Sequence, residues 1–263
     1  MRHVRKPPFL LAAVFAAIVA SSAYAITYGH ADGGGHPSTG ALVFFSPTRH
    51  EYRIECTGTL ISPTVFLTAS HCTAFLEANG ISNVGVSFDS QFDAATSKVY
   101  TGTMHTNPLF NQRASDPEDI AVVTFAHPIQ GIAPVQLPTA GLLDRMSKDK
   151  SIKSASFTSV GYGDQEPTNT PGGKVYPFTG DRRVATGSFN ALNKVWLRLS
   201  ENPSHGDGGT CFGDSGGPQF LGSSNLQVSI TILGDSVCRS TNLDYRLDTP
   251  QARAFLGQFV SLP

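Results

Sequence analysis

The sequence predicts an all-β protein, because short apolar segments alternate along most of its length with Gly, Pro, Asn and Asp, the residues that end strands. No internal repeat or heptad pattern interrupts this arrangement. With 263 residues, of which 40% are hydrophobic and 15% charged, the chain can form one large or two small packed domains. This composition argues against a disordered chain.

Ten segments are predicted to be strands. In chain order they are residues 41–45, 53–62, 65–69, 84–88, 98–105, 119–125, 154–160, 183–189, 195–200 and 227–233. One helix is predicted, at the C-terminal end, where Thr249 can cap it and Pro250 suits its first position. Its apolar face would consist of Ala254, Phe255, Phe259 and Leu262.

The first 25 residues are predicted to be a secretory signal peptide. Positive charges precede an apolar run at residues 9–20, which at 12 residues is too short to span a bilayer. Small residues at Ala23 and Ala25 then suit a cleavage site. The alternative is an uncleaved interfacial anchor. We expect a protein secreted to the extracellular space or the periplasm, with no membrane attachment after cleavage.

Secretion changes how the cysteines are interpreted. Cys56, Cys72, Cys211 and Cys238 form an even set in an oxidising compartment, so two disulfides are expected. The residues by themselves leave three pairings open. The apolar stretch 133–138, followed by the polar stretch 144–151, predicts a boundary between an N-terminal half, 26–138, and a C-terminal half, 139–263.

Composition and spacing argue against two classes of partner. Lys and Arg number 19 against 20 Asp and Glu, a net charge of −1, and no run of basic residues favours nucleic-acid binding. No Cys-x-x-Cys or His-x-x-x-His spacing occurs, so no metal site is expected. No organic cofactor is expected either.

The strongest chemical signal is the stretch 206–218, which has six glycines around Ser215. Glycines let backbone N–H groups converge beside an exposed hydroxyl, although a plain surface turn has the same composition. The stretch also fits the Gly-x-Ser-x-Gly turn of α/β-hydrolases. That enzyme class requires a histidine after the serine, and no histidine follows His205.

Upstream of this stretch lie a histidine and an acid in suitable contexts. His71 adjoins Cys72, and Asp119 begins an apolar strand, so the chain order is His71, Asp119, Ser215. The remaining histidines of the predicted mature chain and two neighbouring acids lie outside such contexts and are predicted to be solvated or locally bonded. They are His30, His36, His50, His105, His127, His205, Asp116 and Glu118.

Three motifs in this order resemble the signatures of trypsin-like serine proteases of the chymotrypsin fold. They are Thr68-Ala-Ser-His-Cys72, Asp119-Ile-Ala and Gly213-Asp-Ser-Gly-Gly-Pro218. The resemblance implies two six-stranded antiparallel β-barrels with a C-terminal helix and an active site in the cleft between them. The N-terminal barrel would supply His71 and Asp119, and the C-terminal barrel Ser215.

The resemblance also implies a role for each residue, inherited from the family's reference triad. Ser215 is the nucleophile, His71 its general base and later the general acid, and Asp119 orients the imidazole. The backbone N–H groups of Gly213 and Ser215 form the oxyanion hole.

The family's disulfide pattern implies Cys56–Cys72 and Cys211–Cys238. The mature chain would begin Ile26-Thr-Tyr-Gly29, which resembles the family's activated terminus. The family then pairs the new amine with the aspartate before the nucleophile, here Asp214. Our hypothesis is that signal peptidase itself creates this terminus.

For substrate binding, the resemblance implies Gly209, Thr210, Phe212, Ile232, Leu233 and Gly234. Gly209, at the base of the primary pocket, carries no charge, which predicts an apolar or small residue before the scissile bond rather than Lys or Arg. Asp207 would contribute only if the loop is remodelled. The family's usual Ser-Trp-Gly is replaced at 232–234 by Ile-Leu-Gly, so a hydroxyl that commonly supports the triad aspartate is missing.

These features together predict a secreted, monomeric serine endopeptidase acting through an acyl-enzyme on protein or peptide substrates. A protein inhibitor is a further expected partner. Two alternatives stay open: a binding protein on an inactive protease fold, and a secreted esterase.

Overall fold

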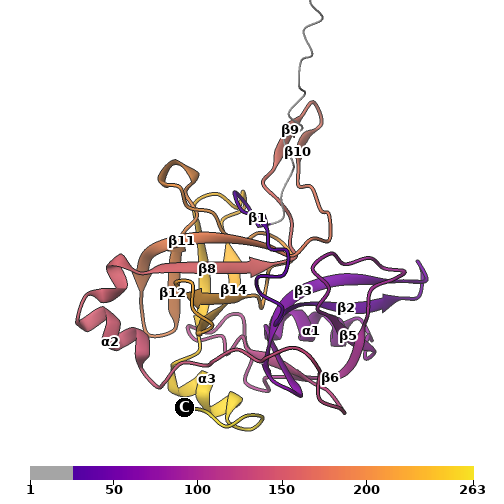
Figure 1. Ribbon diagram of the computed structural model, residues 1–263, viewed down its shortest axis with the longest axis horizontal. Coiled ribbons are helices and arrows are strands. Elements are labelled where there is room, and N and C mark those ends of the chain that lie inside the picture. The colour runs from indigo at the N-terminus through magenta and orange to yellow at the C-terminus, as the bar shows by residue number, and fades with distance from the viewer. Residues whose placement is uncertain (1–25) are drawn as a thin grey trace, which may run out of the picture.

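Two closed β-barrels form the molecule, which Figure 1 shows with the first barrel in purple and the second in orange and yellow. The computed structural model describes residues 26–263, so the predicted signal peptide lies outside the described residues. The first barrel has the strand order β2-β3-β4-β7-β6-β5. Its strands are β2 (Thr39–Ser46), β3 (Glu51–Ser62), β4 (Val65–Thr68), β5 (Val84–Ser87), β6 (Tyr100–Thr106) and β7 (Ala121–Thr124).

The second barrel has the order β11-β12-β15-β14-β13-β8 and closes where β11 pairs with β8. Its strands are β8 (Ser156–Gly161), β11 (Arg183–Leu192), β12 (Trp196–Ser200), β13 (Pro218–Leu221), β14 (Gln227–Gly234) and β15 (Thr241–Arg246). The short β1 (His30–Ala31) pairs with β11. A hairpin of β9 (Thr168–Thr170) and β10 (Gly173–Val175) projects from the body (Figure 1). This architecture confirms the predicted fold class.

Each of the ten predicted strand segments overlaps an observed strand, with small shifts at the ends. The strands β1, β9, β10, β13 and β15 were not predicted. In β15 the burial is the reverse of the usual one, because the polar residues Asn242, Asp244 and Arg246, which alternate with Leu243 and Tyr245, are all buried. In β13 a proline stands at the first position of a strand of four residues.

The helices require three corrections. The sequence predicted only a terminal helix, but α1 (Ser70–Ala78) and α2 (Leu142–Lys148) also form. The polar stretch expected at the boundary becomes most of α2 and a 3₁₀ turn at Ser151–Ser154, and Leu143 anchors this segment in the second barrel. The terminal helix α3 (Pro250–Leu256) stops before Gly257, so two of its predicted face residues lie beyond it.

The predicted cap of α3 does form, since Thr249 Oγ1 accepts a hydrogen bond of 3.2 Å from the N–H of Ala252. Phe259 and Leu262, although outside the helix, still pack against the core. A second 3₁₀ turn spans Pro203–His205. None of the helices in the range 26–263 has the length and apolar character that crossing a membrane requires.

One apolar core continues from the first barrel into the second. In the first barrel Phe66 is fully buried and packs edge-on against Phe88, with ring centroids 5.9 Å apart. The same cluster includes Ile230 of β14 and Phe255 of α3. Because apolar contact runs through both barrels, their relative position is set by packing.

A buried arginine also ties the barrels together. Arg182, just before β11, is 2% exposed, and its Nε donates to Asp32 over 2.7 Å. Its Nη1 donates to the carbonyls of Thr39 and Phe88 in the first barrel, over 3.1 and 3.0 Å. Burial alone would raise the pKa of Asp32, but hydrogen bonds from His36 and Arg182 outweigh it and lower the pKa to about 2.

We expect Arg182→Met to lower the free energy of unfolding by about 3–5 kcal/mol, because it leaves the Asp32 carboxylate buried without its cationic partner. Urea denaturation measures the loss. Arg198→Met, at an exposed position of β12, is the matched control and should stay within about 0.5 kcal/mol of the parent. Equal stability of the two variants would contradict this account of the inter-barrel contact.

Candidate active site

His71 and Asp119 meet because β4 and β7 are paired. The register places Thr68 opposite Ala121, so the residues that follow β4 and precede β7 become neighbours. His71 Nδ1 lies 2.9 Å from Asp119 Oδ2, and the backbone N–H of His71 donates to Asp119 Oδ1 over 2.8 Å. Asp119 is 2% exposed. Two hydrogen bonds to one buried carboxylate hold the imidazole in a single orientation and leave Nε2 as its free ring nitrogen.

Ser70 anchors the start of α1, a role the sequence analysis missed. Its hydroxyl donates to the carbonyl of Ile120 over 2.7 Å and accepts from the N–H of Asn107 over 3.1 Å. The residue before His71 is thereby bonded to the residue after Asp119. Its place inside the histidine motif was the only sequence signal.

The loop that carries Ser215 packs directly on the first barrel. Thr57 of β3 donates from its hydroxyl to the carbonyl of Gly213 and from its N–H to the carbonyl of Ser215, both over 3.0 Å. Gly216 has φ of +79°, and a Cβ there would come within 2.6 Å of the Thr57 oxygen and 2.7 Å of the Ala69 nitrogen. Only glycine therefore fits at Gly216. Nothing in the sequence pointed to Thr57.

Two backbone N–H groups of this loop remain available. Within residues 26–263, neither Gly213 N–H nor Ser215 N–H has a hydrogen-bond partner. The neighbouring carbonyls are engaged elsewhere, since that of Phe212 accepts from Asp164 N–H over 2.6 Å and that of Gly213 accepts from Thr57. Gly213 has φ of +94°. A pair of unpartnered donors beside a serine can stabilise a developing oxyanion.

Ser215 and His71 line one cavity of about 210 Å³ between the barrels. No hydrogen bond joins the Ser215 hydroxyl to His71 in the described part of the chain, and such bonds often tighten only with substrate bound. Of the predicted pocket residues, Gly209 does not line this cavity, whereas the other five do. These are Thr210, Phe212, Ile232, Leu233 and Gly234, joined by Thr231 and Asp235, which the sequence analysis missed.

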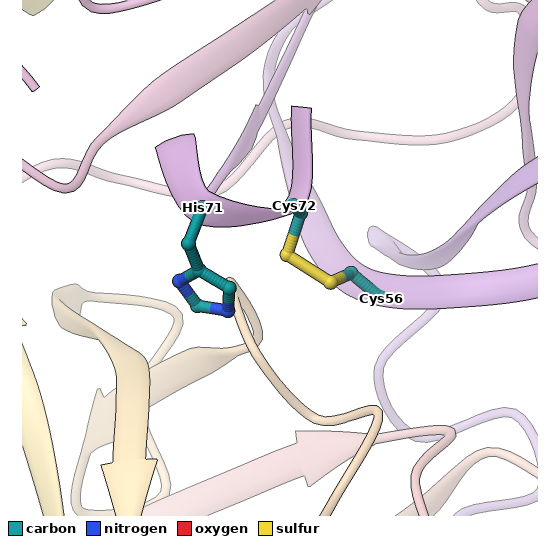
Figure 2. Close-up of side chains that lie close together, drawn as sticks. All are labelled: Cys56, His71 and Cys72. Carbon is teal, nitrogen blue, oxygen red and sulfur yellow. A yellow bond between two sulfur atoms is a disulfide. The ribbon is translucent and has the colours of Figure 1, made fainter. Parts of the chain in front are cut away.

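Cys56 and Cys72 lie beside His71, with their sulfur atoms and a ring nitrogen all within 4.8 Å of one another. Figure 2 shows the two sulfurs bonded to each other next to the imidazole. A disulfide offers no thiolate for a metal, so this cluster braces the histidine. The second pair, Cys211–Cys238, also forms and ties the serine loop to the opposite wall of the cavity.

Asp214 is fully buried beneath the serine loop. Its Oδ1 accepts from the N–H of Gly163 and its Oδ2 from that of Cys211, each over 2.8 Å. It forms no ion pair with another described residue. Burial raises its pKa to about 7, although the two backbone hydrogen bonds act in the opposite direction.

The segment at Ile26 lies close to this loop. The Ile26 side chain is fully buried, and Thr27 exchanges backbone hydrogen bonds of 2.8 and 3.0 Å with Gly209. The expected contact between an Ile26 amine and Asp214 depends on cleavage of the preceding residues, which lie outside the described range.

Comparisons with known proteins bear on this site. A family model described as Trypsin matches residues 30–254. A trypsin from Saccharopolyspora erythraea is 28% identical over 206 residues, covering 78% of this chain and 84% of that protein. Glucanase inhibitor protein 3 from Phytophthora sojae is 28% identical over 222 residues, covering 80% of each protein. Among solved structures, HL collagenase is similar with a TM-score of 0.66 at 19% identity, covering 90% of this chain and 100% of that one.

We expect Gly163→Ala to slow the reaction of Ser215 with a fluorophosphonate by about 10²-fold, the cost of displacing a reacting group by about 1 Å. A Cβ on Gly163 would come within 2.5 Å of the Phe212 carbonyl oxygen and 2.6 Å of the Asp214 carboxyl carbon. Gly172→Ala, in the open β9–β10 turn, is the control, because its Cβ meets only Thr170 Oγ1 at 3.9 Å. Labelling of the Gly163 variant at the parental rate would contradict this explanation of how the Ser215 loop is positioned.

Proposed function

Since the chain belongs to the trypsin family, we propose that it is a secreted serine endopeptidase whose catalytic residues are His71, Asp119 and Ser215. The observation that carries the proposal is one cavity lined by Ser215 and by His71, a histidine bonded to a buried aspartate. Two N–H groups of the serine loop, those of Gly213 and Ser215, also have no hydrogen-bond partner among residues 26–263. Each element of acyl transfer has a candidate there: nucleophile, base, orienting acid and oxyanion donors.

In the proposed reaction, Ser215 Oγ attacks the scissile carbonyl while His71 Nε2 takes its proton. Asp119 stabilises the imidazolium, and Gly213 and Ser215 N–H groups bind the oxyanion. His71 then gives the proton to the leaving amine, which departs and leaves an acyl-enzyme on Ser215. A water molecule, deprotonated by His71, hydrolyses this ester and restores the serine.

The surroundings of the cavity favour a polypeptide substrate over a small ester. A groove of about 590 Å³ adjoins the other side of the serine loop and is lined by Gly213, Phe212, Phe178 and Arg53. It offers room for residues that follow the scissile bond. Two disulfides suit secretion into an oxidising compartment.

We further propose that the Ile26 amine activates the enzyme by pairing with Asp214. A fully buried carboxylate without a cationic partner is costly, and an ammonium beside it removes that cost. The buried Ile26 side chain and the Thr27–Gly209 pairing support this role for the terminus. Cleavage after residue 25 would supply the amine without a separate propeptide.

A second candidate function is binding without catalysis. One relative, 28% identical, is named a glucanase inhibitor protein and not a protease, although the trypsin relative has the same identity. The present chain keeps serine, histidine and aspartate, and His71 and Asp119 are bonded, which favours the enzyme. An esterase would share the same nucleophile.

We expect one fluorophosphonate adduct on the secreted protein, detected by intact mass, on a chain that begins at Ile26 with both disulfides formed. Ser215→Ala should abolish the adduct, whereas Ser223→Ala, in an exposed turn, should retain it. Asp119→Asn should lower kcat for peptide hydrolysis by about 10⁴-fold, which is the established loss for this change in the family's reference triad. No adduct on a correctly processed chain would favour the binding protein, and hydrolysis of esters but of no peptide would favour the esterase.

An extra residue before Ile26 should lower kcat by about 10²–10³-fold, the effect of losing one oxyanion donor, while the fold persists. The pH dependence should differ as well. In the processed form the ion pair raises the pKa of the Ile26 amine above its free value of about 8. The ion pair therefore stabilises the folded protein fully below about pH 8, and this stabilisation is lost as the pH rises through the raised pKa.

In the extended form Asp214 has no amine partner, and its pKa is raised to about 7 by burial. The folded state then binds a proton more tightly than the unfolded state, so stability falls as pH rises from about 4 to about 7. Thermal unfolding of both forms across this range measures the difference. Full activity of the extended form, or identical pH profiles, would refute the activation proposal.

A further inference from the structure

A buried glutamate lies directly behind the wall of the primary cavity. Glu201 follows β12 and is fully buried. Its Oε1 accepts from the N–H of Thr210 over 2.5 Å and from the Thr210 hydroxyl over 3.1 Å. Its Oε2 has no hydrogen-bond partner in the described part of the chain. Since Thr210 lines the cavity, this residue connects the cavity wall directly to the Glu201 carboxylate.

The glutamate carboxylate also occupies the space that a side chain on residue 209 would fill. A Cβ built on Gly209 would overlap the Glu201 carboxylate and lie 2.5 Å from its Cδ. The glycine is therefore what makes room for Glu201. Although residue 209 is not an acid, Glu201 places an acid behind this part of the pocket.

A second buried acid lies behind the adjoining wall. Asp244 of β15 pairs with Thr231 of β14, another residue that lines the cavity. Asp244 Oδ1 accepts from Gln219 over 3.2 Å and from Asn242 over 3.1 Å, while its Oδ2 has no hydrogen-bond partner among the described residues. Asp244 is fully buried.

Neither carboxylate forms an ion pair with a cation among residues 26–263. Burial raises the pKa of Glu201 to about 8 and that of Asp244 well above its ordinary value, and the charge of Glu201 raises the latter further. The cavity lining adds a third acid, Asp235, and contains neither lysine nor arginine. Unpaired buried acids are costly unless a positive charge reaches them.

We propose that Glu201, with Asp244 behind it, determines the charge preference of the primary pocket, so that the enzyme cleaves after a cationic, lysine-like side chain. This inference rests on the protease function proposed above. The hydroxyls of Thr210 and Thr231 accept hydrogen bonds from the substrate ammonium. The cation favours loss of the protons that the two buried acids otherwise hold, and the resulting carboxylates stabilise its charge from behind. The proposal replaces the apolar or small preference predicted from Gly209.

The other acid weighed from the sequence does not reach the pocket. Asp207 Oδ2 accepts from the Ser188 hydroxyl of β11 over 2.8 Å, and Asp207 is absent from the cavity lining. It therefore provides a matched control: a neighbouring acid on the same loop, with its own hydrogen bond, pointing elsewhere.

The test uses peptide substrates that differ only in the residue before the scissile bond, lysine or its uncharged analogue norleucine. We expect the processed parent enzyme to prefer lysine by about 10²-fold in kcat/KM. Glu201→Gln, which keeps an acceptor for Thr210, should reduce this preference about tenfold or more, and Asp244→Asn should reduce it in the same direction. Asp207→Asn should leave it unchanged.

The outcomes separate this inference from the function on which it rests. If Ser215 is labelled by the fluorophosphonate but the parent enzyme prefers norleucine, the inference is wrong and the proposed protease function is retained. A lysine preference that Glu201→Gln does not change would overturn the inference in the same way. The parental ratio tests the proposal even if a variant fails to fold. If the processed chain gives no adduct and cleaves no peptide, the proposed function fails, and this inference fails with it.

Discussion

The close packing of the Ser215 loop on the first barrel is the contact on which the whole site depends. Gly216 approaches the backbone of Thr57 and Ala69 so closely that no side chain fits between them. Through this contact the serine of one barrel faces the histidine of the other across a shared cavity. In the proposed enzyme the reacting groups therefore come from both barrels, and we expect a change at their interface to alter reactivity as well as stability.

Buried charge is handled in two different ways in this molecule. Between the barrels, Arg182 and Asp32 form a buried ion pair, and Arg182 also donates to backbone carbonyls, so each charge has a partner. Beneath the serine loop and the cavity, Asp214, Glu201 and Asp244 have no cationic partner among residues 26–263. In our interpretation the positive charges that these acids lack come from a new chain terminus and from the substrate. The cost of burying an unpaired carboxylate then links folding, activation and specificity.

Overall similarity separates function poorly in this case. The chain is as close to a trypsin as to a protein named glucanase inhibitor, both at 28% identity, and at 19% identity the collagenase shows the fold alone. A shared fold hosts different activities, so the decision rests on side-chain geometry. Here the bonded His71–Asp119 pair and the free N–H groups of Gly213 and Ser215 favour catalysis.

The sequence by itself determined the all-β class, the ten main strands and the three family motifs, because these depend on short-range patterns and on a few consecutive residues. Tertiary structure alone decided the rest. The helices α1 and α2 are short and gain their stability from packing, and β15 buries the polar residues of its alternating pattern, the reverse of what the pattern predicts. The burial of Glu201 against Gly209 is likewise a property of the folded chain, because it depends on how the segment after β12 packs.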